Sequence, residues 1–184
     1  MSPPGEPTDH AVMARIQSGD EIALGILLRR YWGGLVTYAQ RFVDDGAIAE
    51  DLTQEAFVRL WESREGWTPE GSVRGYLYTI TRNLCLNERE KRSVREDWAR
   101  RERFRSSSQP TPADVLDERE TARVLLQEIE RLPVRRREIF ELGCLHGLSY
   151  REIAETLGVA IPTVANQMSA AIKHLRSVVR ALPE

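Results

Sequence analysis

Apolar residues recur every three or four positions along almost the whole chain, and this spacing constrains the fold more than any other feature. Such spacing places apolar side chains on one face of an α-helix. Period-two alternation, the mark of half-buried strands, is nearly absent, and no Asn-Gly or Asp-Gly pair joins two alternating segments as in a tight hairpin. The sequence therefore predicts an all-α protein.

Residues that favour turns divide the helical pattern into segments. The interruptions are Ser18-Gly19, Gly33-Gly34, Asp44-Asp45-Gly46 and the loop 66–71, which contains two glycines and a proline. Asp9 and Asp20 stand where helix N-caps are expected. The predicted helices lie near 10–18, 21–31, a segment after Gly34 that ends near 43, 47–63, 72–92, 113–131, 133–145, 149–157 and 162–180.

A stretch without apolar periodicity separates two groups of helices. Residues 93–112 contain Ser106-Ser107-Ser108, two prolines and many charges, a composition typical of a flexible linker. Fully extended, these residues would reach roughly 70 Å, comparable to about 20 base pairs of duplex. We therefore expect two small helical domains, residues 1–92 and 113–184, joined by this linker.

The formal net charge of −2 hides an uneven distribution. Residues 1–73 carry six Arg against twelve Asp and Glu, whereas residues 74–105 carry ten Lys and Arg against five acids. A cationic stretch can neutralise phosphates and an anionic surface would repel them, so the pattern suggests two different partners. The alternative is a set of helix faces with mixed, solvated charge.

Several protein classes are disfavoured by composition. No apolar run approaches the ~18 residues of a membrane span, and the opening MSPPGEPTDH lacks the basic and apolar parts of a signal peptide. We expect a cytoplasmic protein. Cys85 and Cys144 are too few for a disulfide framework, and both lie in apolar-periodic segments where buried thiols are expected.

The segment GLSYREIAETLGVAIPTVANQM, residues 147–168, predicts a helix-turn-helix. Ser149 and Glu152 form a capping box, and Gly158 can end the first helix in a left-handed conformation. The predicted buried stripe of the second helix is Val164, Met168, Ile172, Leu175 and Val179, which leaves Thr163, Asn166, Gln167, Ala170 and Lys173 on the opposite side. Asn and Gln pair with adenine edges, so this side suits a major groove. A plain structural bundle is the alternative, and the opening of this helix has no cation.

The middle of the chain combines cations with aromatic rings. Within 72–92 the spacing places Arg74, Tyr78, Arg82, Arg89 and Arg92 on one face, and Val73, Leu77, Ile80 and Leu84 on the other. Trp67 and Tyr76 lie just before or at the start of this helix. Rings that stack on unpaired bases beside cations are the components of a single-strand binding site. The alternative places both rings in the core.

The helix near 47–63 has an acidic stripe with an apolar centre. Ile48, Leu52, Ala56 and Leu60 are predicted to be buried, and Asp51, Gln54, Glu55, Val58 and Glu62 to form a second stripe. This stripe is either a solvated face or a docking site for a basic partner protein.

Three segments in this order resemble the sigma-70 family of bacterial RNA polymerase initiation factors, in particular its small extracytoplasmic-function (ECF) group. They are EDLTQEAFVRLW, GSVRGYLYTITRNLCLNEREKR and the region from LPVRRREIFELG to SAAIKHLR. The resemblance implies, respectively, docking on the clamp coiled coil of core polymerase, recognition and melting of the minus-ten element, and minus-thirty-five recognition on the polymerase flap. Tyr76 stands where the family usually has Trp, Asn87 where it usually has Asp, and Ala165-Asn166-Gln167 where it often has a basic-Ser-Arg triplet.

The resemblance and the residue patterns together assign three sets of site residues. Polymerase binding is assigned to Asp51, Gln54, Glu55, Val58 and Glu62. Minus-ten DNA, including the melted single strand, is assigned to Trp67, Arg74, Tyr76, Tyr78, Arg82, Asn83, Arg89 and Arg92. Minus-thirty-five duplex is assigned to Thr163, Asn166, Gln167, Ser169, Lys173 and Arg176. The resemblance also implies an anti-sigma partner, and it implies neither catalytic residues nor a cofactor or metal.

Two other classes of function are weaker interpretations of the same residues. A stand-alone repressor or activator would bind duplex as a dimer through 149–176, but it would leave the acidic stripe and the aromatic loop without a role. A metal enzyme would use Cys144 and His146, but Cys85, His10 and His174 complete no zinc-like spacing.

Overall fold

The computed structural model describes residues 7–68, 71–102 and 118–181, and every regular element in these ranges is helical. The chain divides into two compact units, residues 1–103 and 104–184, which we describe separately. The prediction of an all-α fold with two helical domains is confirmed. In these ranges no helix combines the length and the apolar character that crossing a membrane requires.

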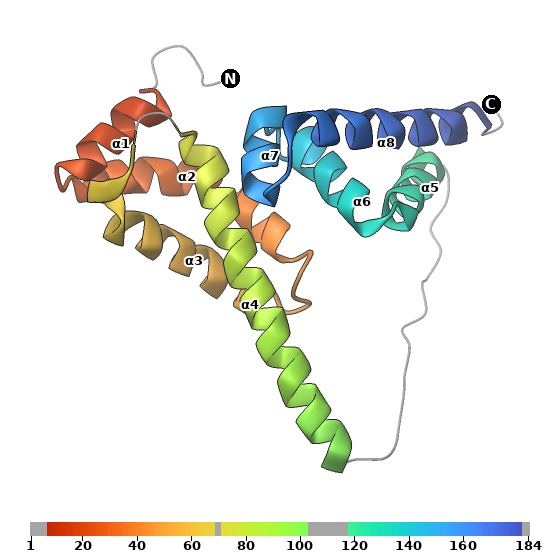
Figure 1. Cartoon of the computed structure of the whole chain (residues 1–184), viewed down its shortest axis with the longest axis horizontal. Coiled ribbons are helices and arrows are strands. Elements are labelled where there is room, and N and C mark those ends of the chain that lie inside the picture. Colours follow the sequence, from red (N-terminus) through yellow and green to blue (C-terminus); the bar gives the residue numbers. More distant parts are fainter. Residues whose placement is uncertain (1–6, 69–70, 103–117, 182–184) are drawn as a thin grey trace. The chain divides into compact units, whose positions relative to one another are not determined.

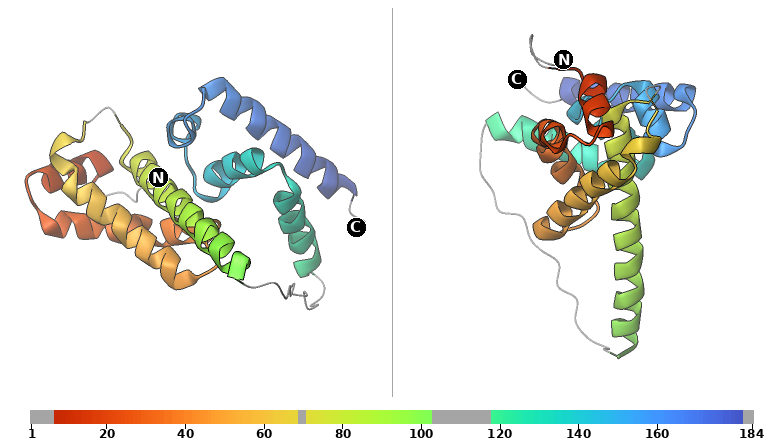
Figure 2. Two further views of the ribbon diagram at one scale, coloured as in Figure 1. Left: turned by 60° about the horizontal axis from the view of Figure 1, so that its bottom comes forward. Right: turned by 90° about the vertical axis from the view of Figure 1, so that its left-hand side faces the viewer.

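The described residues of the first unit form four α-helices and one short 3-10 helix. They are α1 (Asp9–Gln17), α2 (Glu21–Ala39), α3 (Gly46–Glu62), the 3-10 helix η1 (Arg64–Gly66) and α4 (Val73–Glu102). Helices α2 and α3 pack side by side, and α4 packs against both, as the views of Figures 1 and 2 show. The largest fully buried side chains of this unit include Met13, Leu27, Tyr38, Leu60 and Leu77.

Helix α2 corrects one sequence prediction and confirms another. Gly33-Gly34 do not break it, because Leu27, Leu35 and Tyr38 on either side of the glycines are all buried in the same core. This burial outweighs the roughly 1 kcal/mol that each helical glycine costs. Asp20 caps α2 as predicted, with its side chain accepting from the Ala23 N–H at 3.2 Å.

The start of α1 differs from the prediction. Thr8 is the N-cap, and the Asp9 carboxylate instead pairs with Arg30 and accepts a hydrogen bond from the Tyr31 hydroxyl, both on α2. An acidic side chain at this position therefore holds α1 against α2 rather than capping its own helix.

Helix α4 is longer than predicted. The periodic pattern ends near Arg92, but the helix continues to Glu102, so residues 93–102 of the expected linker are helical. The C-terminal half of α4 extends beyond α1, α2 and α3 in Figures 1 and 2. The rest of the expected linker, 103–112, lies outside the described residues.

The second unit is a compact bundle around α8. Its elements are α5 (Glu118–Arg131), α6 (Val134–Phe140), the π-helical turn η2 (Glu141–Leu145), α7 (Tyr150–Leu157) and α8 (Ile161–Ala181). Helix α8 packs against α5, α6 and α7, around a core that includes Ile139, Leu142, Ile153 and Val164. The predicted helix 133–145 thus forms as an α-helix followed by a π-helical turn.

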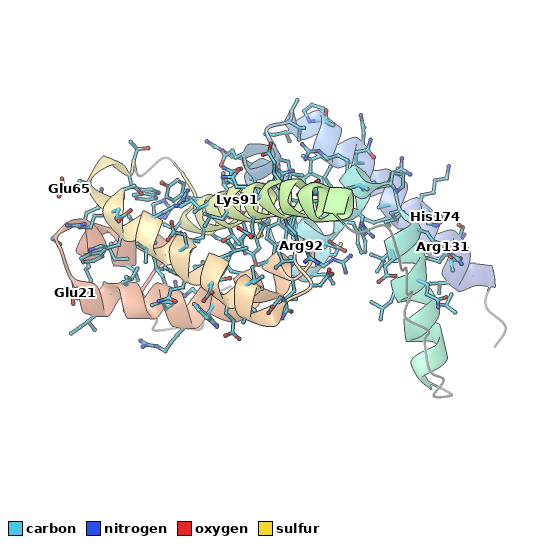
Figure 3. All side chains as sticks on the ribbon, turned by 90° about the horizontal axis from the view of Figure 1, so that it is seen from below. Glu21, Glu65, Lys91, Arg92, Arg131 and His174 are labelled. Atoms are coloured by element: carbon cyan, nitrogen blue, oxygen red, sulfur yellow. The ribbon has the colours of Figure 1, made fainter. Side chains whose placement is uncertain are left out.

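Polar contacts join α5 to α8 at the edge of this bundle. Glu128 accepts hydrogen bonds from Arg131 on its own helix and from His174 Nε2 on α8, the latter at 3.0 Å. Figure 3 labels the two donors, Arg131 and His174. The hydrogen bonds from Arg131 and His174 hold the pKa of Glu128 below its ordinary value.

Candidate nucleic-acid and partner interfaces

The predicted helix-turn-helix is present in α7 and α8. The Ser149 N–H donates to Glu152 Oε2 at 2.6 Å, and the Glu152 N–H donates to Ser149 Oγ at 3.3 Å, which is a complete capping box. Gly158 ends α7 with φ at +63°, a conformation that residues with a side chain rarely adopt. These local features fix the turn between α7 and α8.

The buried face of α8 agrees with the prediction as far as Leu175. Val164, Met168 and Leu175 are buried, together with Ala171. Ile172 is half-buried, and Val179 is 46% exposed because the end of α8 extends past α5 (Figure 1). The prediction that Val179 is a core residue is therefore wrong.

Five of the six predicted minus-thirty-five residues lie on the solvent side of α8. Gln167 differs from them, because it is half-buried and its Oε1 accepts a hydrogen bond from Arg136 Nε of α6 at 3.0 Å. Sequence patterns missed Arg136, since 31 residues separate it from Gln167 and no periodicity links them. The five exposed residues are Thr163, Asn166, Ser169, Lys173 and Arg176.

Helix α4 presents fewer of the predicted minus-ten residues than expected. Asn83, Arg89 and Arg92 are exposed, whereas Arg74 and Arg82 are half-buried. Tyr78 is only 3% exposed, and its ring lies 5.3 Å from that of Tyr38. The assignment of Tyr78 to the exposed face is wrong, because α1, α2 and α3 all pack against α4 and widen its buried side. Burial raises the pKa of Tyr78 to about 12.

Trp67 and Tyr76 are both half-buried. The Tyr76 hydroxyl lies 3.0 Å from Ser63 Oγ, and its ring packs beside a buried cluster that includes Ala56 and Ile80. The Trp67 ring meets the ring of His10 edge-on, with centroids 5.6 Å apart. The Trp67 carbonyl accepts a hydrogen bond from Gln17 Nε2 at 2.9 Å.

Helix α1 therefore holds the loop that precedes α4. Its residues His10 and Gln17 both contact Trp67, about fifty positions further along the chain. No sequence pattern indicates either contact, because each depends on how α1 packs in the folded unit.

The acidic stripe of α3 is exposed along its whole length. Asp51, Gln54, Glu55, Val58 and Glu62 all face solvent, and Val58, the apolar centre, is 42% exposed. Glu55 pairs with Arg59 one turn further on, with 2.9 Å between Arg59 Nε and the carboxylate oxygen. Exposed pairs of this kind contribute little to stability, so the stripe is available to a partner.

An apolar groove of about 570 Å³ lies between α2 and α3, beside this stripe. The Trp32 and Phe57 rings stack within its lining with centroids 6.4 Å apart. The Arg64 guanidinium lies 4.4 Å from the centre of the Trp61 ring, a cation–π contact. The lining residues are Leu24, Leu28, Trp32, Phe57, Val58 and Trp61, with Gln54 and Glu21 among them, and Figure 3 labels Glu21.

Sequence patterns do not predict this groove. The helix predicted over 21–31 ends before Trp32, and no spacing indicates that the side of α3 with Phe57 and Trp61 is half-open. The spacing of Leu24, Leu28 and Trp32 at intervals of four is a helical signal that predicts one apolar stripe.

The two cysteines have different environments. Cys85 is fully buried, as predicted, and burial raises its pKa to about 12. Cys144 is exposed, because it lies on the outer side of the π-helical turn, so its predicted burial is wrong. Across residues 7–68, 71–102 and 118–181, no group of three His, Cys, Asp or Glu side chains is arranged to hold a metal ion.

Two helical units, the second with a helix-turn-helix, are typical of DNA-binding proteins, and comparisons with known proteins show the family. The models of sigma-70 region 2 and sigma-70 region 4 match residues 27–95 and 122–175. The ECF RNA polymerase sigma factor SigE of Mycolicibacterium smegmatis is 31% identical over 96% of this chain and 69% of that protein. The ECF RNA polymerase sigma-E factor of Escherichia coli K12 is 27% identical over 95% of this chain and 96% of that protein.

A solved structure agrees with these relatives. The sigma factor RpoE of Bartonella quintana, in complex with the anti-sigma factor NepR, matches with a TM-score of 0.60 and 25% identity, over 86% of this chain and 98% of that chain. The chain belongs to the sigma-70 family, within its ECF group. It directs RNA polymerase to promoters, and it is not an enzyme.

Proposed function

We propose that the acidic stripe and the apolar groove of the first unit together form the surface that docks on core RNA polymerase. The observation that carries this proposal is their continuity, since Gln54 and Val58 belong to the stripe and also line the groove. An apolar centre with a charged rim is the usual anatomy of a protein interface. The acidic rim favours a basic partner surface, and the clamp coiled coil is the element that the family resemblance implies.

The second unit contacts the upstream duplex through α8. The exposed side of α8 offers Thr163, Asn166 and Ser169 as hydrogen-bonding groups, followed by Lys173 and Arg176. Asn can pair with adenine through both its donor and its acceptor, which distinguishes bases in the major groove. The flap of the polymerase would hold this unit near the minus-thirty-five element.

The first unit captures a base of the melted minus-ten strand. Trp67 and Tyr76 lie near the start of α4, and the exposed cations of that helix continue away from them. Unstacking a base costs a few kilocalories per mole, and stacking on an aromatic ring returns roughly 1–3 kcal/mol per base. The protein thereby assists melting without a catalytic group, and it acts in the cytoplasm, where bacterial polymerase and DNA are found.

An anti-sigma protein is the expected regulator. The related sigma factor of Bartonella quintana is seen with one, and the apolar groove is a surface that such a protein would cover. Covering it would compete directly with polymerase docking.

A transcription assay with core polymerase on a promoter library tests this function. We expect promoter-specific transcripts only when protein and core enzyme are both present, and a shared upstream and minus-ten sequence among the promoters used. Tight sequence-specific duplex binding without polymerase, and no specific transcript with it, would instead favour a stand-alone regulator.

A further inference from the structure

The first half of α8 has no cation on its own surface. From Ile161 to Ile172 the helix contains no Lys or Arg, and Lys173 is the first. Contacts with phosphates supply a large share of the affinity of most DNA-binding proteins. A recognition helix of this composition therefore needs positive charge from another element.

Arg136 of α6 supplies a cation beside the first half of α8. Its Nε donates to Gln167 Oε1 at 3.0 Å, and both side chains are half-buried. The neighbouring arginines are engaged elsewhere: Arg135 pairs with Glu138 at 3.3 Å, and Arg137 Nη1 donates to the Glu130 carbonyl at 3.1 Å. Arg136 is thus the member of this arginine triplet that is bonded to the first half of α8.

The position of Gln167 on α8 points to the wall of a DNA groove rather than to its floor. Successive residues of an α-helix are rotated by about 100°. Asn166 and Lys173 lie opposite the buried residues Val164 and Met168, so Gln167 lies about 100° to one side of the outward direction. A helix of about 10–12 Å diameter nearly fills a major groove about 12 Å wide, so its flanks face the phosphate backbones.

We propose that Arg136 and Gln167 together bind one backbone phosphate of the upstream duplex, at the wall of the groove that α8 enters. This inference rests on the proposed contact of α8 with the minus-thirty-five duplex. The Gln167 acceptor is occupied by Arg136, so the amide offers its Nε2 donor beside the remaining guanidinium donors. Two adjacent donors, one of them charged, suit a phosphate oxygen. Gln167 is then a backbone contact and not the adenine contact that its polar side chain suggested.

The test measures binding of upstream duplex by the full chain assembled with core polymerase, over a range of salt concentrations. Arg136→Ala should weaken binding about tenfold and reduce the slope of log affinity against log salt by about 0.9, equally for every upstream sequence. Gln167→Ala should act in the same direction but more weakly, and should add nothing to Arg136→Ala. Arg131→Ala, which removes an exposed cation of α5 in the same unit, is the matched control and should change neither quantity.

Arg136→Gln keeps a donor for Gln167 while removing the charge, so it tests the proposal even if Arg136→Ala is poorly folded. It should lower the salt slope as Arg136→Ala does. An unchanged salt slope in both Arg136 variants overturns the proposal, and so does a Gln167→Ala variant that changes base preference at an unchanged slope.

The variants Asn166→Ala and Lys173→Ala separate this outcome from failure of the proposed function. If they also leave duplex binding unchanged, α8 does not contact the duplex. If they change duplex binding and the Arg136 variants do not, only the phosphate contact is wrong.

Discussion

The two long helices, α4 and α8, differ in the chemistry of the side chains that they expose. Each buries one side in its own unit, but α4 exposes Arg89, Lys91 and Arg92, whereas the first half of α8 exposes only neutral groups such as Thr163 and Asn166. Figure 3 labels Lys91 and Arg92 on α4. Cations bind any phosphate backbone, while amides and hydroxyls discriminate among bases. The difference suggests that the first unit supplies affinity and the second supplies selection.

A recognition helix with no cation in its first half needs only a little positive charge from a neighbouring element when its unit is already held near DNA. A domain tethered to a polymerase on the promoter binds at a high effective concentration, so it needs few phosphate contacts of its own. The single cation that α6 contributes through Arg136 fits this division, because it adds affinity without adding base preference.

The largest expected effect tests whether polymerase docking belongs to the first unit. Val58→Asp places a charge at the apolar centre of the stripe and should reduce affinity for core polymerase by roughly 30-fold or more, as at interface hot spots. Val179→Asp is the matched control, since this valine is 46% exposed in the second unit against 42% for Val58. Fluorescence anisotropy of labelled protein with core enzyme measures both, and equal losses would contradict the assignment.

The second prediction concerns the cations of α4. Arg89→Ala combined with Arg92→Ala should reduce open-complex formation about tenfold and lower its salt dependence, because about two phosphate contacts are lost. Permanganate reactivity of unpaired thymines reports the melted strand. Arg15→Ala, at an exposed cation of α1 that pairs with Asp20, is the control and should leave opening unchanged.

The third prediction contrasts selection with affinity on α8 itself. Asn166→Ala should change which upstream elements are used, by roughly tenfold for the preferred base, with little change in salt slope. Ala165→Arg should strengthen binding to all upstream sequences and steepen the salt slope by about 0.9. Competition among promoters in one transcription reaction separates the two outcomes. Promoter choice that survives Asn166→Ala unchanged would remove the selective role of this helix.

The smallest expected effect concerns the contact between α5 and α8. Hydrogen bonds from Arg131 and His174 lower the pKa of Glu128 from its ordinary value of 4.5, so its ionised form stabilises the folded unit. This stabilisation is present above pH 4.5 and disappears as the pH falls through the lower folded-state pKa. Glu128→Gln should therefore lower the melting temperature at neutral pH, and the difference should close in acid.

A control variant checks that prediction. Glu155→Gln removes a carboxylate from an exposed pair with Arg151 on α7, and should leave the melting temperature unchanged. If the melting temperature of Glu128→Gln stays below that of the wild type at low pH, the contact stabilises the unit by packing rather than by charge.

The features that sequence predicted well are those that neighbouring residues determine. The capping box of Ser149 and Glu152, the left-handed Gly158 and the stripe Val164–Met168–Leu175 all depend on spacings within two or three turns of one helix. The acidic stripe of α3 is equally local, and its five residues are all exposed.

The features that sequence missed depend on which helices pack together. Tyr78 has the right spacing to join the arginines of α4, but neighbours on several sides bury it. Gly33-Gly34 favour a helix break locally, but α2 continues through them because residues on both sides are buried in the core. The groove residue Trp32 and the cation Arg136 acquire their roles from partners on other helices, at Phe57 and Gln167, and no periodicity encodes such pairs.

Because α1 contacts Trp67 through His10 and Gln17, the proposed capture of a melted base also depends on the beginning of the chain. Gln17 and His10 lie before residue 27, where the match to sigma-70 region 2 begins, yet they support the loop proposed to receive a flipped base. A tag, a proteolytic cut or a binding protein at the N-terminal side of α1 would therefore alter promoter melting while leaving the polymerase-docking groove intact. On the proposed function, we expect changes at this end of the chain to affect promoter opening and not assembly with the polymerase.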